Sequence, residues 1–315
     1  MSATKPPTTP PPRTEAEVEL PPVEPPTGPA GSAKARKMRE AGFGEPRANW
    51  IAYAVLGLGL VIVTSPFIWM ALSSVKSEGE IRRVPPTWIP EAPTLDNFRE
   101  LFDRLDFPQF FTNSALVATV VTLGNLVFCS MLGYVLAKYD FAGKKTLFRL
   151  VLATLMIPGM VTLVPLFVLV ANMGLVNTYF GLILPFLAAP FGVFLMRQFF
   201  LGIPDELIDA ARVDGAGEAR IFAQVVVPLA KPALATLAIL TFLGSWNNFL
   251  WPLVVATSED KYTLPVALAL YSTGQNQTDY GLMLAGAVVV VTPMLILFLI
   301  LQRFFVQGVA MTGIK

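Results

Sequence analysis

Residues Ser114–Leu136 read SALVATVVTLGNLVFCSMLGYVL, a stretch without a single charged side chain. A helix advances by about 1.5 Å per residue, so about 20 apolar residues cross a hydrocarbon core of roughly 30 Å. A helix also bonds its own backbone N–H and C=O groups, which lipid cannot do. The stretch therefore predicts a membrane-spanning helix.

Five further stretches of the chain pass the same test of length and apolar composition. They are Trp50–Leu72, Leu150–Ala171, Gly181–Phe200, Pro232–Val255 and Leu282–Phe304. Only the short uncharged link Asn172–Tyr179 separates two of them, so a long buried helical hairpin is an alternative at that point. We expect an all-α membrane protein with six transmembrane helices.

The composition of the chain supports a membrane protein and excludes several classes of function. Of 315 residues, 54% are hydrophobic and 14% are charged, against about 25% charged in soluble domains. The formal net charge of +1 argues against nucleic acid, whose phosphates need clustered Lys and Arg. The absence of histidine and the single cysteine, Cys129, exclude Ser-His-Asp and Cys-His catalysis and the usual zinc ligand sets. We expect no catalytic residues and no metal site.

Lys and Arg are biased toward cytoplasmic loops, and in this chain they are concentrated in alternate links between the spans. One side receives the basic residues of segments 34–47, 138–149 and 197–231 and the tail after Arg303. The other side receives segments 76–112, 172–179 and 257–280, the last with a lone Lys261. Segment 76–112 supports this pattern least, because it is acidic overall but contains Arg82 and Arg83. This alternation predicts that both termini lie in the cytoplasm.

Residues 1–47 differ in composition from the rest of the chain. They are rich in proline, threonine and glutamate, and they end in a basic patch of Lys34, Arg36, Lys37, Arg39 and Arg47. Such a segment cannot bury an apolar core, so it is expected to be disordered. The first apolar run begins near Trp50, too far from the start for a cleaved signal peptide. The expected organisation is a disordered cytoplasmic tail, 1–47, followed by a six-span domain, 48–315.

The link between the fourth and fifth predicted spans, Leu201–Lys231, reads LGIPDELIDAARVDGAGEARIFAQVVVPLAK. Pro204 suits a first helical position, and the acidic residues after it favour the positive end of a helix dipole. We expect one helix over 205–212, a turn in which Gly215 and Gly217 supply positive φ or close approach, and a second helix over 218–227 that Pro228 stops. The link therefore predicts a hairpin of two short helices.

Several apolar side chains of this hairpin are predicted to be exposed, namely Leu207, Ile208, Ile221 and Phe222. An exposed apolar surface of this kind usually marks a contact with a partner. The alternative is an amphipathic hairpin that lies in the lipid headgroups.

A resemblance of this link to a known sequence signature favours contact with a partner over the lipid headgroups. Asp209-Ala210-Ala211, Gly215 four residues later, and then Val225, Val227 and Pro228 resemble the EAA signature of ABC importer permeases. Asp209 stands where that family usually has glutamate. In the family this link forms coupling helices that dock into a cytoplasmic ATPase subunit, which here implies a coupling role for Asp209, Ala210, Ala211, Asp214, Gly215, Ala216, Phe222 and Pro228.

The resemblance extends over residues 48–315, which are similar to the smaller six-span permease of the maltose-type carbohydrate importers. It rests on Phe111–Ser114, Gly181–Pro185, Trp246–Phe249 and the tail Gln302–Gly308. It implies a bacterial plasma membrane protein that acts with a second permease subunit, two ATPase subunits and an extracellular solute-binding protein. ATP and Mg²⁺ would be bound by the ATPase, and this chain would hold no cofactor.

Polar residues inside spans are costly and tend to face the bundle interior, so they are candidates for a substrate path. The candidates are Asn125, Trp246, Asn247 and Asn248. Hydrogen bonding between helices for assembly is the alternative role. Pro158, Pro165 and Pro185 are expected to break or kink their spans, as happens in bundles that rock between two states.

Three other functions remain as alternatives. A secondary carrier would hold an ionisable group at the midplane of a span, and none lies there. A membrane enzyme would need a set of acids, bases or metal ligands near one leaflet, which the absence of histidine disfavours. A nucleotide-binding loop is also not found, because the segment Gly143–Thr146 lacks the residues of a P-loop. A glycerol phosphate permease would be expected to carry Arg or Lys in the path. The sequence therefore favours a neutral sugar.

Overall fold

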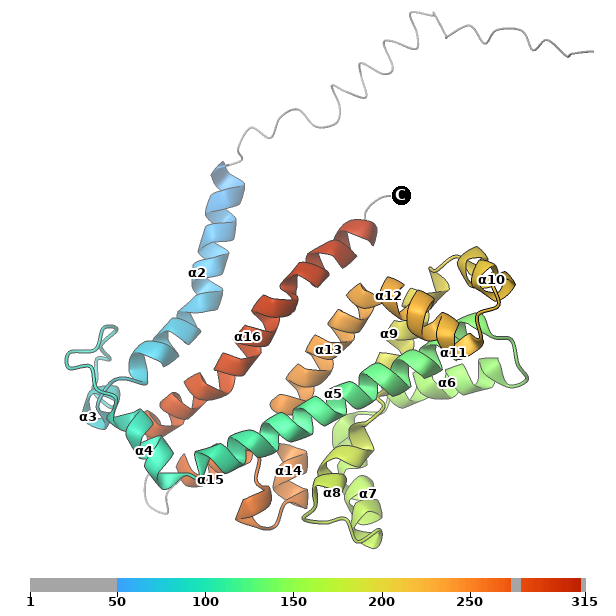
Figure 1. The fold of residues 1–315 in the computed structure, drawn as a ribbon. Helices are drawn as coiled ribbons and strands as arrows, with labels where there is room; N and C mark the ends of the chain where they lie inside the picture. Colours follow the sequence, from blue (N-terminus) through green and yellow to red (C-terminus); the bar gives the residue numbers. More distant parts are fainter. Residues whose placement is uncertain (1–49, 273–278, 313–315) are drawn as a thin grey trace, which may run out of the picture. The chain divides into compact units, whose positions relative to one another are not determined.

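A computed structural model describes residues 50–272 and 279–312 of the chain. The tail predicted for residues 1–47, with its basic end, lies outside the described residues. The chain divides into two units at residue 63, and the second unit, Thr64–Lys315, contains all the sites discussed below. Within the described residues every regular element is helical, as an all-α fold requires (Figure 1).

The elements in chain order, with their bounds, are α2 (Trp50–Ser73), α3 (Glu78–Ile81), α4 (Asp96–Arg104), α5 (Phe107–Lys138), α6 (Lys144–Leu155), α7 (Gly159–Asn172), α8 (Tyr179–Ile183), η1 (Leu184–Phe186), α9 (Pro190–Leu201), α10 (Asp205–Val213), α11 (Glu218–Ile221), η2 (Phe222–Val226), α12 (Val227–Leu229), α13 (Lys231–Trp246), α14 (Leu250–Val255), η3 (Glu259–Lys261), α15 (Leu264–Ser272) and α16 (Tyr280–Thr312).

The long helix α5 is the centre of the second unit, and it packs against α9 and α13, while α13 also packs against α16. Small residues allow these close contacts. A Cβ atom on Gly133 would lie 2.8 Å from the Met196 Cβ atom, and one on Gly192 would lie 2.8 Å from the Cys129 Sγ atom. Helices in lipid associate through such close packing because burial from water does not drive them together.

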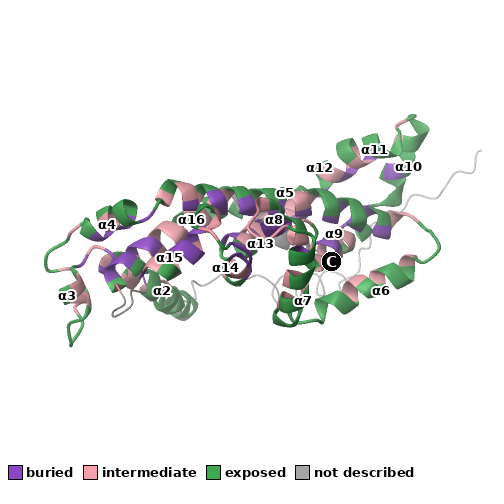
Figure 2. Ribbon diagram, turned by 90° about the horizontal axis from the view of Figure 1, so that it is seen from below, coloured by how far each residue is buried: buried purple, intermediate pink, exposed green. Residues whose placement is uncertain are grey.

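The opposite side of α5 remains exposed and apolar (Figure 2). The side chains of Leu123, Val127, Phe128 and Met131 all lie on this side. An apolar surface of this extent is tolerated where lipid, rather than water, covers it. The described residues therefore have the surface of a membrane protein.

Four described helices are long and apolar enough to cross a membrane, or up to six if each of two bent pairs counts as one span. The first, second and sixth predicted spans correspond to α2, α5 and α16. The fourth corresponds to the span Tyr179–Leu201, inside which η1 and the loop before Pro190 interrupt the α-helix around Pro185.

The third predicted span, Leu150–Ala171, is not one straight helix. It is divided between α6 and α7, which are bent by 105° relative to each other. Pro158 is the cause, because proline has no N–H to donate and disfavours helical geometry in the residue before it. Pro165, by contrast, lies inside α7 without breaking it.

The fifth predicted span, Pro232–Val255, is also interrupted. α13 ends at Trp246, and α14 begins at Leu250. At its other end α13 is bent by 80° from the helix over 218–229. The break falls at Ala230, two residues before Pro232, which has no N–H to donate to the carbonyl of Pro228 four residues earlier.

The described links that were predicted to alternate between two sides gather in two separate places, whereas segment 34–47 lies outside the described residues. At one end, Asn177 bonds Thr257 and Ser258, and Asn113 donates to the carbonyls of Asp260 and Tyr262. At the other end, the residues after α5 contact the Leu201–Lys231 segment, as described next. Which end is cytoplasmic stays a prediction.

Candidate functional site

The Leu201–Lys231 segment forms the predicted helical hairpin, and its first helix is α10. Pro204 lies just before the helix, and Asp205 and Glu206 occupy its first turn. The helix ends at Val213, and Gly215 then adopts a φ of +79°. Ala216 N–H donates to the carbonyl of Ala211 across this turn, which satisfies a helix-end carbonyl in the manner of a Schellman cap.

The second helix begins after Gly217, whose φ of −71° is ordinary, so only Gly215 supplies the predicted positive φ. The expectation that Pro228 stops the second helix is wrong. The helix widens into a π-turn over Phe222–Val226 and continues through Pro228 to Leu229. The wider turn relieves the clash between a proline ring and the carbonyl four residues earlier.

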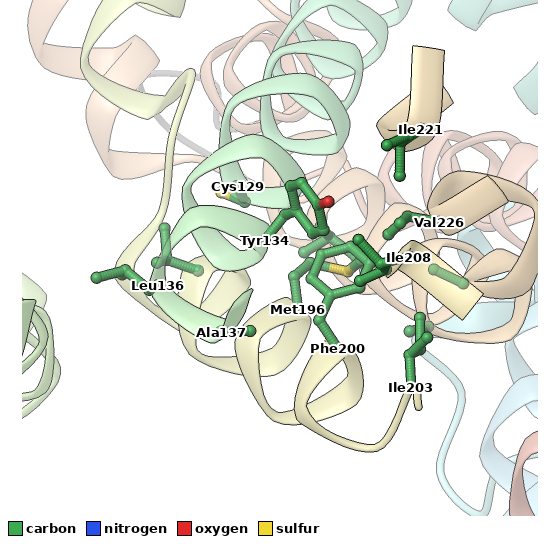
Figure 3. Close-up of a cluster of buried hydrophobic side chains, with 14 residues drawn as sticks. Cys129, Tyr134, Leu136, Ala137, Met196, Phe200, Ile203, Ile208, Ile221 and Val226 are labelled. Atoms are coloured by element: carbon green, nitrogen blue, oxygen red, sulfur yellow. The ribbon is translucent and has the colours of Figure 1, made fainter. Parts of the chain in front are cut away.

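The two helices are held onto the bundle by a buried apolar cluster (Figure 3). Ile208 of α10 is 2% exposed and Ile221 of α11 is 0% exposed. They pack with side chains from α5 and α9, including Tyr134 and Phe200. The expectation that Ile208 and Ile221 are exposed is therefore wrong, because the hairpin turns its apolar side toward its own bundle.

Leu207 is 46% exposed, as predicted, and Val213 at the end of α10, which was not singled out, is 88% exposed. Phe222 is half-buried, and its ring lies 5.3 Å from the Tyr134 ring. Leu229 at the end of the second helix is 45% exposed. The exposed apolar side chains of the hairpin are therefore on α10 and at the far end of the second helix.

The residues predicted to couple to an ATPase occupy two places. Six of them lie together on α10 and the following turn: Asp209, Ala210, Ala211, Asp214, Gly215 and Ala216. Phe222 is in the π-turn against the bundle, and Pro228 is exposed farther along the second helix. Of the first six, Asp209, Ala210, Asp214 and Gly215 are exposed, whereas Ala211 and Ala216 are partly buried against the apolar cluster. The last two lie away from α10 and its turn.

Charged side chains link the two helices of the hairpin. Arg212 donates to the carboxylate of Asp209 at 2.9 Å and to that of Glu218 at 2.8 Å. The hydrogen bonds from Arg212 and then from Tyr139 lower the pKa of the Glu218 carboxyl. The same bond to Glu218 raises the pKa of Arg212, so both groups keep their charge at neutral pH.

Two residues attach the hairpin to α5: Lys138, the last residue of the helix, and Tyr139, which follows it. Lys138 Nζ donates to the Asp205 carboxylate at 2.6 Å and also to the carbonyl of Ile203. The Tyr139 hydroxyl donates to Glu218, and burial followed by this bond raises the pKa of Tyr139. One residue therefore holds the start of α10, and the next holds the start of α11.

Sequence reasoning missed both of these roles. Lys138 was interpreted only as a cytoplasmic positive charge, and Tyr139 was not singled out. The one available signal was a Lys-Tyr pair directly at the end of a span. Their partners are about 65 and 79 residues away in the chain, so the contacts follow only from the fold.

The substrate-path candidates are divided between several environments. Asn125 is buried, and its amide donates to the carbonyls of Val121 and Phe186 and accepts from Ala189 N–H. Trp246 is also buried, and its indole N–H donates to the Val290 carbonyl at 2.9 Å. Both side chains join helices of the bundle in this conformation.

Asn247 and Asn248 lie in the break after α13 but line different pockets. Asn248 shares a pocket with Asn125, whereas Asn247 lines another pocket with residues of α15 and α16. The structure therefore brings only Asn125 and Asn248 together. Contact of any of the four with substrate stays a prediction.

Residues 130–311 match the family model described as "Binding-protein-dependent transport system inner membrane component". The match includes the hairpin, the end of α5 and the helices α9, α13 and α16. The chain belongs to this family. It is an inner-membrane transport component of the ABC permease type.

Characterised relatives of this permease cover most of its length. It is 42% identical over 273 residues to the arabinooligosaccharides transport system permease protein AraQ of Halalkalibacterium halodurans, which covers 86% of this chain and 98% of the relative. It is 37% identical to the diacetylchitobiose uptake system permease protein NgcG of Streptomyces coelicolor, over 84% of this chain and 88% of the relative. It is 31% identical to the sn-glycerol-3-phosphate transport system permease protein UgpE of Escherichia coli, over 84% of this chain and 96% of the relative.

A solved structure shares the fold of the permease. A chain of a bacterial ABC transporter involved in the import of the acidic polysaccharide alginate matches with a TM-score of 0.73 and 23% identity. The match covers 84% of this chain and 99% of that chain. At this level of identity the similarity shows the fold alone, and it confirms the expected ABC permease fold.

Proposed function

We propose that this permease is a subunit of an ATP-driven importer for a neutral oligosaccharide. The observation that carries the proposal is the 42% identity, over 98% of its length, to a permease named for arabinooligosaccharides. The relative named for diacetylchitobiose supports the same substrate class. The proposed substrate class is therefore a short neutral sugar chain.

The surface formed by Asp209, Ala210, Ala211, Asp214, Gly215 and Ala216 is proposed to dock into a separate ATPase subunit. Its polar side chains and the exposed Val213 and Leu207 suit a partner that is partly apolar. Phe222 and Pro228 would contribute by shaping the second helix rather than by direct contact. The cluster around Ile208 and Ile221 would then pass a movement of the docked hairpin to α5 and α9.

The assembly proposed around this subunit contains a second permease, two ATPase subunits and an extracellular solute-binding protein. ATP and Mg²⁺ are assigned to the ATPase, and this chain is proposed to have no catalytic site of its own. Among the described residues, no group of His, Cys, Asp and Glu is arranged to hold a metal ion. In this assembly the hairpin and both termini are proposed to be cytoplasmic, because they lie on the side that receives the segments rich in Lys and Arg.

A test of the proposal uses the full transporter, purified with its partner subunits and reconstituted into proteoliposomes. Uptake of labelled arabinotriose, diacetylchitobiose and lactose is measured with ATP inside the vesicles and the binding protein outside. ATP-dependent uptake of at least one neutral sugar is expected. Uptake of none of them, by a complex whose ATPase is stimulated by its binding protein, would contradict the substrate class.

Glycerol 3-phosphate is a second candidate, because UgpE is 31% identical over 96% of its length. A phosphate would be expected to meet Arg or Lys in its path. The pocket that holds Asn125 and Asn248 contains neither. Uptake of labelled glycerol 3-phosphate in the same vesicles separates the two candidates: it exceeds sugar uptake if the phosphate is the substrate and stays at background if a sugar is.

A further inference from the structure

One pocket of the second unit lies among α5, η1, α9 and α13, and it has a volume of about 310 Å³. Ligand pockets begin at about 300 Å³, so this pocket has room for roughly one sugar ring. It reaches the surface beside Phe191, which is 44% exposed, and beside Leu240, which is 40% exposed. The residues that line the pocket include Thr241, Ser245, Asn248, Phe186, Phe191 and Gly244.

Two of the lining residues carry free hydroxyl groups. Hydroxyl side chains in helices usually bond the carbonyl three or four residues earlier, and Thr122, Thr236 and Thr292 do so. The hydroxyls of Thr241 and Ser245 have no hydrogen-bond partner among the described residues, although both residues lie in the same helix as Thr236. Both side chains are partly exposed and line the pocket, so their hydroxyls are open to water or to a ligand.

Two of the polar residues lie on one side of α13, and the third follows the helix. Thr241 and Ser245 are four residues apart, and positions four apart are neighbours on a helix surface. Asn248 lies in the break after α13 and lines the same pocket. The Asn248 side-chain oxygen accepts from Trp251 N–H at 3.3 Å, and its NH₂ group has no partner among the described residues. Asn125 also lines the pocket, but its side-chain amide is already hydrogen-bonded to the backbone of Phe186 and Ala189.

The pocket also offers the ring of Phe186 and the exposed ring of Phe191. A sugar ring presents hydroxyls at its edge and an apolar C–H face, so it needs both hydrogen-bonding and apolar partners. A second pocket, of about 290 Å³, has a lining that suits an apolar lipid chain instead of a sugar. It is lined by Val120, Ile183, Leu184, Leu187 and two aromatic residues, without a free hydroxyl.

We infer that Thr241, Ser245 and Asn248 form a subsite for one ring of a neutral sugar, with Phe186 and Phe191 against its apolar face. The inference rests on the proposed function and assigns its substrate to this subunit. It replaces Trp246 and Asn247, which do not line this pocket, with two residues that sequence reasoning did not single out.

The test uses the reconstituted transporter and two kinds of variant. Thr241→Val and Ser245→Ala each remove a hydroxyl with little change in shape, and we expect each to lower the rate of arabinotriose uptake about 3- to 10-fold. Thr236→Val is the matched control, because its hydroxyl is bonded to the Pro232 carbonyl. It is expected to transport at the wild-type rate.

Gly244→Leu fills the pocket. A Cβ atom at Gly244 would meet no other atom within 4 Å, so the variant is expected to fold. It should abolish sugar uptake while ATP hydrolysis stimulated by the binding protein persists. Gly159→Leu, at another glycine with open space around it, is the control and should transport normally.

The outcomes separate this inference from the proposed function. If the wild-type complex transports none of the sugars, the proposed function fails. If the wild type transports and Thr241→Val, Ser245→Ala and Gly244→Leu all transport at the same rate, the proposed function stands and the subsite is overturned. Loss of uptake in these variants with normal uptake in both controls supports the subsite.

Discussion

The Tyr139 hydroxyl donates a hydrogen bond to the carboxylate of Glu218, a residue 79 positions farther along the chain. The bond joins the end of α5 to the first residue of α11. Since Lys138 holds the start of α10 in the same way, α5 carries both helices of the hairpin.

Tyr139→Phe is expected to uncouple the transporter. It removes the bond to Glu218 but keeps the ring, which lies 5.6 Å from the Tyr134 ring. ATP hydrolysis stimulated by the binding protein should continue, while sugar uptake per ATP falls about 3- to 10-fold, as expected for the loss of one hydrogen bond. Tyr134→Phe is the matched control, because the Tyr134 hydroxyl makes no hydrogen bond to Glu218 or any other described residue of the hairpin. Equal coupling ratios in the two variants would refute this role of Tyr139.

Gly215→Val is expected to abolish transport while the protein remains in the membrane. Gly215 has a φ of +79°, which a β-branched residue adopts only at a cost of about 1–2 kcal/mol or more. The turn that follows Val213 would therefore change shape. Gly217→Ala should be tolerated, because Gly217 has a φ of −71° and open space around it. Uptake and membrane content are measured for both variants, and normal uptake by Gly215→Val would disprove the requirement.

Ile221→Ala is expected to loosen the hairpin from the bundle. Ile221 is fully buried in the cluster with Tyr134 and Phe200, and such truncations cost about 2–5 kcal/mol. Faster hydrogen exchange in residues 205–229 is the expected observation. Val213→Ser changes an exposed side chain, so it should leave exchange unchanged and instead weaken binding of the ATPase subunit. Faster exchange in Val213→Ser and weaker ATPase binding without faster exchange in Ile221→Ala would contradict this assignment of the buried and docking sides.

Asp209→Lys is expected to abolish transport, because it places a positive charge beside Arg212 and replaces one of the two negative charges of the docking surface with a positive one. Asp209→Glu restores the length of side chain that the family usually has at this position and should support uptake. Both variants are compared with the wild type for uptake and for retention of the ATPase subunit during purification. Wild-type uptake by Asp209→Lys would contradict the coupling role.

Acid is expected to release the link between the two hairpin helices. The folded-state pKa of Glu218 is lowered from its ordinary value of 4.5, chiefly by the bond from Arg212. A lowered pKa means that the carboxylate stabilises the fold above pH 4.5 and that this contribution is lost as the pH falls through the folded-state pKa. The protection of residues 205–229 against hydrogen exchange, relative to the intrinsic exchange rate at each pH, should therefore fall below about pH 4.5 in the wild type. Glu218→Gln should be less protected at pH 7 and lose less protection with acid, and an unchanged pH dependence in this variant would assign the effect to another group.

Local sequence patterns were sufficient for the positions of most helices and for the hairpin. The uncharged run Ser114–Leu136 predicted α5, and the order of Pro204, Asp205 and Gly215 predicted where α10 begins and ends. These features depend on residues a few positions apart, and their physical causes act over that same distance. The break at Pro158 was foreseen, but the 105° bend there was not, because hydropathy does not record direction.

The sequence by itself determined that this is an all-helical membrane protein with an EAA-type hairpin, since apolar length and turn residues leave little choice. Only the tertiary structure decided which side of the hairpin is buried, that Lys138 and Tyr139 hold it, and that Thr241 and Ser245 share a pocket with Asn248. The physical reason is that an amphipathic helix can turn its apolar side toward its own bundle, a partner or lipid. Local patterns are the same in all three cases, and contacts between residues far apart in the chain select one of them.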